Sequence, residues 1–130
     1  MTQTEYRRAL MGAEHFGVDG RIGEGSVYHC YHGEAGVTAQ TVLQWHPFEV
    51  ITTEDMVMPG VTLLVEYRLA PVESGTHMVI TFSKAEGPPA ESQLADTMLW
   101  STLYDFRRNG ERFAEQITAE AHRAGEIPLA

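Results

Sequence analysis

The sequence predicts an α+β fold, in which a curved antiparallel β-sheet of about six strands packs against one long C-terminal helix. Three observations support this prediction. Runs rich in β-branched and aromatic residues alternate with short turn signals between residues 14 and 83. After residue 91, apolar residues recur at steps of three and four, as they do on one face of a helix. Before the first strand, "TEYRRALMG" is typical of a shorter helix.

Each predicted strand ends at a residue pair or loop that favours a turn. Asp19-Gly20, "GEAG" (33–36), "HPFE" (46–49), Pro59-Gly60 and "PVESG" (71–75) separate the strands, and Pro47 cannot donate to a sheet ladder. Because the loops are short, successive strands should be antiparallel neighbours. The predicted strands are "AEHFGVDG", about residues 26–32, 37–45 and 50–58, "VTLLVEYRLA" (61–70) and "THMVITFS" (76–83).

The last third of the chain predicts a helix over about residues 92–122. Ser92 follows the breaker segment "GPPAES" and is a plausible N-cap. Gly110 lies on the apolar stripe, where glycine costs about 1 kcal/mol relative to alanine, so we expect a close approach to the sheet there. The stripe comprises Leu99, Leu103, Phe106, Gly110, Phe113 and Ile117.

Size and charge exclude several classes of protein. The 130 residues suit one domain, residues 1–130, with a single core. A net charge of −9 without a basic run argues against nucleic-acid binding. The single cysteine cannot form an internal disulfide, which fits a reducing compartment. No apolar run approaches the roughly 20 residues of a membrane span, and no signal peptide is evident. A soluble cytoplasmic protein without an integral membrane segment is the expectation.

Strand alternation predicts which side chains face the helix. Pairing across "GEAG" places His32 opposite Val37 and Cys30 opposite Ala39, so that one apolar face collects the first set of inward residues. This set comprises Ser26, Tyr28, Cys30, His32, Val37, Ala39, Thr41, Leu43 and Trp45. The hairpin at "PVESG" aligns Leu63, Val65, Tyr67, Leu69, Met78, Ile80 and Phe82 on the same side.

The direction of the acidic residues between 50 and 58 depends on the strand register. If Met58 pairs with Val61, then Thr52, Glu54 and Met56 also point inward, whereas a slip of one residue would substitute Asp55 for Glu54. A carboxylate in an apolar cavity could act as a general acid or base. The simpler interpretation is a strand acid that points to water.

The segment "SVYHCYHG" (26–33) admits three interpretations. As a metal site it lacks ligands, because His29 points away from Cys30 and His32 and zinc needs three or four. As a nucleophile, Cys30 would lie roughly 6 to 7 Å from His32 by strand rise, too far for a hydrogen bond. As pocket lining, Tyr28, Cys30 and His32 offer polar groups on an apolar wall. Pocket lining and a plain core role remain equally open.

Four segments resemble a known superfamily over roughly residues 5–120. They are "GRIGEGSVYHCYHG", "TVLQWHPFEVIT", "VEYRLAPVESGTHMVITF" and the closing helix. They resemble the SRPBCC (START-like, helix-grip) superfamily, in particular its polyketide cyclase/dehydrase and lipid-transport-like bacterial branch. The loose motifs that carry the resemblance are Trp45, Pro47 and Phe48, followed by Leu69, Pro71, Gly75 and Thr76.

The resemblance implies a deep pocket for hydrophobic or amphipathic molecules, and it implies no shared catalytic residues. Members of the superfamily usually begin with a further strand and helix, so this chain is expected to be N-terminally truncated relative to them. The uncovered sheet edge makes a homodimer attractive.

Taken together, the expected function is binding of a small hydrophobic ligand between the sheet and the C-terminal helix. The alternatives are a polyketide cyclase/dehydratase-like enzyme that uses Glu54 as acid/base, and a protein-interaction or regulatory module. Neither a cofactor nor a metal is expected. The expected ligand-binding residues are Tyr28, Cys30, His32, Thr41, Trp45, Glu54, Tyr67, Met78, Leu99 and Leu103.

Overall fold

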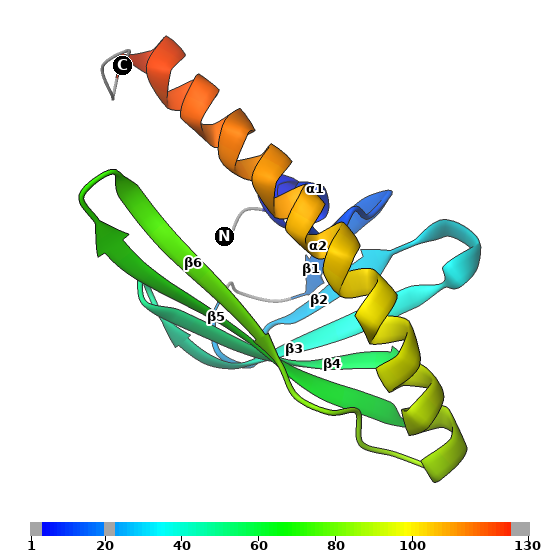
Figure 1. Cartoon of the computed structure of the whole chain (residues 1–130). Coiled ribbons are helices and arrows are strands. Elements are labelled where there is room, and N and C mark those ends of the chain that lie inside the picture. Colours follow the sequence, from blue (N-terminus) through cyan, green and yellow to red (C-terminus); the bar gives the residue numbers. More distant parts are fainter. Residues whose placement is uncertain (1–3, 20–22, 126–130) are drawn as a thin grey trace.

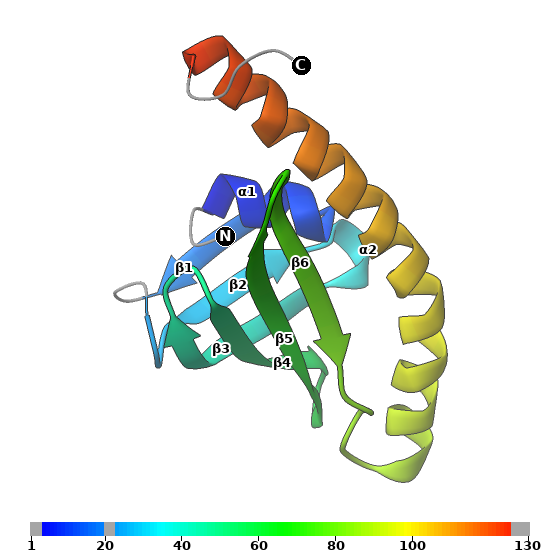
Figure 2. The same ribbon diagram turned by 60° about the vertical axis from the view of Figure 1, so that its left-hand side comes forward.

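The computed structural model describes residues 4–19 and 23–125 of the chain. It contains one antiparallel sheet of six strands in the order β1-β2-β3-β4-β5-β6, and a long helix, α2, lies across one face of this sheet (Figures 1 and 2). The predicted α+β class, the short N-terminal helix and the long C-terminal helix are confirmed. The arrangement is compatible with a helix-grip fold. None of the helices in the described part of the chain is long and apolar enough to cross a membrane.

The secondary-structure elements lie close to their predicted positions. Strand β4 matches its prediction at both ends, and the other strands differ by one or two residues. The predicted turn at Asp19-Gly20 lies partly outside the described residues. The elements are α1 (Thr4–Met11), β1 (His15–Asp19), β2 (Val27–Tyr31), the 3-10 turn η1 (Gly33–Ala35), β3 (Val37–His46), β4 (Val50–Met58), β5 (Val61–Val72), β6 (Gly75–Phe82) and α2 (Pro89–Ala124).

The start of α2 differs from the prediction. The helix begins at Pro89, and Pro88 occupies the N-cap position, so the predicted N-cap at Ser92 is wrong. Proline is tolerated in the first turn because its missing N–H would have no partner there. Ser92 lies one turn inside the helix, where its hydroxyl donates to the Pro88 carbonyl at 3.0 Å. The helix ends at Ala124, and its C-cap residue Gly125 has a left-handed φ of 73°.

Two residues of the predicted stripe of α2, Phe106 and Phe113, are buried, whereas Ile117 at its end is 38 % exposed. Phe106 is 8 % exposed and packs edge-to-face on Phe82 of β6, with ring centroids 5.4 Å apart. Gly110 does not approach the sheet. A Cβ atom at this position would lie 3.9 Å from Cδ1 of Leu10, so the glycine faces α1 instead. Helix α1 therefore packs between the second half of α2 and the sheet edge at β1 (Figure 2).

The core lies between the inner face of the sheet and the two helices. Strand β5 alternates as predicted, with Leu63, Val65 and Tyr67 at most 5 % exposed. The expected inward direction of Met78, Ile80 and Phe82 on β6 is also confirmed, because these partly buried residues pack against the core. The buried core cluster comprises Leu10, Ala13, Tyr28, Cys30, Val42, Ile51, Leu63, Val65, Tyr67 and Phe106.

The pairing of β2 with β3 differs from the prediction by one residue. Tyr31, not His32, pairs with Val37, and Cys30 pairs with Thr38. The cause is that His32 leaves the strand and donates its N–H to the Gly36 carbonyl across η1, which makes the connection one residue longer than expected. In the first part of β3, the side chains predicted to face inward therefore face outward, and the reverse, since a slip of one residue exchanges the two faces of a strand.

Gln40 and Val42 therefore point inward in place of Thr41 and Leu43. Gln40 is fully buried, whereas Leu43 is 49 % exposed. A register shift between Val42 and Gln44 then restores the predicted direction further along the strand, so that Trp45 pairs with the buried Ile51 and packs against the core.

A one-residue difference in register also exchanges the two faces of strand β4. Met58 pairs with Val61 as expected, but the register shifts between Met56 and Met58, and Asp55 pairs with Leu63. Thr52, Glu54 and Met56 consequently lie on the outer face, and their predicted inward direction is wrong. Asp55, the residue that a slip would substitute, is 3 % exposed on the inner face.

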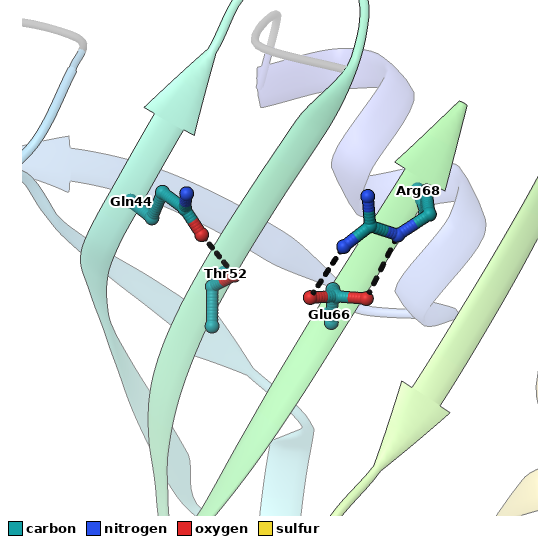
Figure 3. Close-up of polar contacts among 4 residues, drawn as sticks. All are labelled: Gln44, Thr52, Glu66 and Arg68. Atoms are coloured by element: carbon teal, nitrogen blue, oxygen red, sulfur yellow. Dashed lines mark hydrogen bonds and ion pairs between the residues drawn. The ribbon is translucent and has the colours of Figure 1, made fainter. Parts of the chain in front are cut away.

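The outer face carries polar side chains that pair with one another (Figure 3). The Thr52 hydroxyl donates to Gln44 Oε1 at 3.3 Å, and Arg68 donates twice to the Glu66 carboxylate, at 3.1 and 3.2 Å. Since both ion-pair partners are solvent-exposed or half-buried, this pair contributes little to stability. Strands β1 and β6 form the two edges of the sheet, and the homodimer through an uncovered edge remains a prediction.

We expect Phe106→Ala to lower the free energy of unfolding by about 3 kcal/mol, because it removes the buried ring that joins α2 to β6. Tyr104→Ala is the matched control, since Tyr104 lies on the same helix and is 73 % exposed; its effect should stay within about 0.5 kcal/mol. Urea denaturation followed by circular dichroism measures both. Equal effects of the two substitutions would contradict this packing.

Candidate functional site

A cavity of about 290 Å³ lies between the inner face of the sheet and the first half of α2. Its walls come from β3, β4, β5, β6, α1 and α2, so distant parts of the sequence build it together. The apolar lining residues are Met11, Val57, Met58, Leu63, Phe82, Ala95, Met98, Leu99 and Phe106, and the polar ones are His32, Thr38, Asp55 and Thr102. An apolar wall with a few polar groups is the usual composition of a small-molecule site.

Asp55 is the buried carboxylate of this cavity. The Gln40 side-chain amide donates to Asp55 Oδ2 at 2.6 Å, and the Thr53 hydroxyl donates to Asp55 Oδ1 at 2.6 Å. Gln40 and Thr53 are both fully buried. A polar group in an apolar interior is tolerated only when it is hydrogen-bonded, and here two donors hold one carboxylate in a defined orientation.

Two strand pairings bring this cluster together. Gln40 lies directly opposite Asp55 in the β3–β4 ladder, and Thr53 lies two residues from Asp55 on the same face of β4. The inward orientation of Gln40 depends on the register of β3, and that of Asp55 depends on the register shift near Met58. A pattern of alternating residues read along one strand could not identify the cluster, because its members become neighbours only through the ladder.

His32 lies at the cavity wall beside the end of β2. Its backbone (φ −119°, ψ 37°) departs from the extended strand, and its Nε2 lies 2.9 Å from Cys30 Sγ. The separation of 6 to 7 Å predicted from strand rise is therefore wrong, because the chain turns at His32. Cys30 itself is fully buried and does not line the cavity.

The environment of His32 favours the neutral imidazole. Burial lowers the pKa of His32 below its usual 6.5, and the nearby Glu14 carboxylate opposes this by favouring the charged form. A neutral ring has one nitrogen donor and one acceptor, so His32 can present either type of group to its surroundings.

The histidine of the opposite face takes no part in this site. His29 lies on the outer face of β2, as predicted, and its Nε2 is 2.8 Å from Asp19 Oδ2. Within residues 4–19 and 23–125, no group of three or more histidine, cysteine or acidic side chains is arranged to hold a metal ion.

The structure brings two of the ten expected ligand-binding residues to the cavity wall, namely His32 and Leu99. Tyr28, Cys30 and Tyr67 are buried in the adjoining core, where the Tyr67 hydroxyl lies 3.7 Å from Met11 Sδ. The half-buried residues of the set are Trp45, Met78 and Leu103, and those on the outer face are Thr41 and Glu54. The ligand-binding role of these residues remains a prediction.

Several lining residues escaped the sequence analysis. Asp55 appeared only as the result of a register slip, and the predicted pairing of His32 with Val37 and of Cys30 with Ala39 would place Thr38 on the outer face. Ala95 lies one helical turn before Leu99 and extends the predicted stripe toward the helix start. The available signal was this spacing of four residues within the predicted helix.

We expect Glu14→Gln to lower the pKa of His32 further, because the substitution removes the charge that favours imidazolium. NMR titration of the ring protons measures this pKa. Glu34→Gln, a nearby exposed position in η1, is the control and should leave the titration unchanged. A pKa of His32 that does not change in Glu14→Gln would contradict the assigned cause.

A pH dependence of stability follows from the same residue. The folded-state pKa of His32 lies below its unfolded value, so the unfolded chain binds a proton more readily as pH falls. The free energy of unfolding should therefore decrease from about pH 6.5 downward to the folded pKa. Urea titrations at several pH values should show a shallower decrease in His32→Gln than in the parent protein.

Neither a protein-family model nor a curated protein sequence matches this chain. Among solved structures, the crystal structure of CalU16 from Micromonospora echinospora is similar to it, with 17 % sequence identity and a TM-score of 0.46. The similarity covers 92 % of this chain and 80 % of CalU16. A likeness of this extent establishes neither a common family nor a shared activity.

Proposed function

We propose that this protein binds a small hydrophobic or amphipathic molecule in the cavity between the sheet and α2. The observation that carries the proposal is the cavity itself, in which nine apolar side chains surround a buried, oriented carboxylate. A core that served stability alone would be close-packed and would gain nothing from a carboxylate at a void.

Apolar burial would supply most of the affinity. Each 100 Å² of apolar ligand surface removed from water contributes about 2.5 kcal/mol, from which the cost of immobilising the ligand must be subtracted. Met11, Met58 and Met98 supply three of the lining side chains. Their unbranched thioethers adapt to ligands of different shape at low cost.

Asp55, His32 and Thr38 would orient the ligand. They are supplied by or beside the neighbouring strands β2, β3 and β4, and Thr102 faces the cavity from α2. A ligand with one polar end and one apolar end therefore has a defined direction in the cavity.

The buried carboxylate also favours a second candidate function, a cyclase- or dehydratase-like enzyme. A carboxylate in an apolar site can accept a proton from a carbon atom next to a carbonyl group and return it elsewhere on the same molecule. Asp55 would take this role, since Glu54 lies on the outer face. Asp55→Asn would then abolish turnover and leave substrate binding intact, whereas the binding function has no turnover to lose.

Filling the cavity provides the test of the binding function. Ala95→Leu adds three carbon atoms at a lining position, and we expect it to weaken binding of the neutral fluorophore N-phenyl-1-naphthylamine by about ten-fold or more. The matched control is Ala114→Leu, the same substitution at an exposed position on the same helix, which should bind like the parent protein.

Fluorescence titration measures the dissociation constants, and thermal unfolding shows that both variants are folded. If the parent protein does not bind the fluorophore, or if Ala95→Leu binds it as tightly as the parent does, the proposed function is wrong. Native mass spectrometry of the protein purified from its host would identify a retained ligand directly.

A further inference from the structure

The residues that line the cavity in the described part of the chain include an acidic side chain but no lysine or arginine. Of the thirteen described residues that line it, Asp55 is the only one with an acidic side chain, and none is lysine or arginine. His32 is the remaining titratable side chain with a basic ring, and burial favours its neutral form. With the Asp55 carboxyl group ionised, the lining side chains would contribute a single negative charge.

The hydrogen bonds at Asp55 are of the kind that a carboxylate accepts. Both carboxylate oxygens accept a hydrogen bond, from the Gln40 amide and from the Thr53 hydroxyl, and donors on both oxygens favour the ionised form.

We propose that the cavity selects ligands that carry a cationic amine at the end of an apolar body, and that it rejects carboxylates of the same size. This inference rests on the proposed function and names the ligand class of the same site.

The physical reason is the low polarity of the surroundings. Attraction between opposite charges, and repulsion between like charges, are several-fold stronger beside a protein interior than in water. An ammonium group near Asp55 would offset the cost of a carboxylate among apolar side chains, and a ligand carboxylate would increase that cost. The aromatic residues Phe82 and Phe106 also line the cavity, and the face of an aromatic ring, unlike its edge, attracts a cation.

The charge of the whole chain acts in the same direction. With a net charge of −9, the protein attracts cations and repels anions over long range, an effect that salt screens. The experiment must therefore separate the local carboxylate from the overall charge.

Octylamine, octanol and octanoate share one apolar tail and differ in the charge of the head group. We expect isothermal titration calorimetry at pH 7.5 and 150 mM salt to rank octylamine about ten-fold or more above octanol, and octanol above octanoate by a similar factor. In Asp55→Asn, which keeps the side-chain shape, the three dissociation constants should converge.

Glu54→Gln is the matched control, because it removes the same formal charge one residue away on the exposed outer face. This variant should keep the ranking of the parent protein, so a ranking lost in both variants would assign the selectivity to overall charge and overturn the inference. If Asp55→Asn does not fold, the ranking in the parent protein is compared at 150 mM and 1 M salt, because salt screens attraction to the overall charge much more than attraction to a buried carboxylate. A ranking lost at 1 M salt would overturn the inference.

The remaining outcomes distinguish the two proposals. If octanol binds as tightly as octylamine, the charge selectivity is wrong and the proposed function stands. If none of the three probes binds, the inference is overturned, and the fluorophore titration then shows whether the proposed function falls with it.

Discussion

The long helix α2 and the short helix α1 together cover the inner face of the six-stranded sheet, and the other features of the structure depend on how they pack against it. Helix α2 touches β6 at the edge-to-face pair of Phe106 and Phe82, and α1 fills the space between its second half and β1. The first half of α2 passes over the inner face at the cavity and contributes Ala95 and Leu99 to its wall. The cavity is thus the space that two helices leave beneath a curved sheet.

The chemistry of that space is set by single-residue irregularities in the strands. Because side chains alternate, each added residue exchanges the inner and outer faces of everything that follows. The departure of His32 from β2 turns Gln40 inward, and the shift near Met58 turns Asp55 inward. Without either change, the buried face would carry Thr41 and Glu54 and the polar cluster would not form.

The polar cluster has a structural cost that a plain core would avoid. Gln40, Thr53 and Asp55 are buried polar side chains, and each must satisfy its hydrogen bonds internally. Asp55 lies next to a void rather than in a filled layer, so the cluster also places a carboxyl group at the cavity wall. His32 adds a second polar group whose neutral state is maintained by burial.

The sequence by itself determined the α+β class, the strand order and the apolar stripe of α2, because these depend on local periodicity and turn chemistry. It also determined which side chains of β2, β5 and β6 face the core, since regular alternation holds within each of these strands. Only the tertiary structure decided the directions of Thr41, Glu54 and Asp55 and the contact between Cys30 and His32. These depend on backbone irregularities whose position is settled by pairing with a neighbouring strand, and no residue pattern within one strand encodes that pairing.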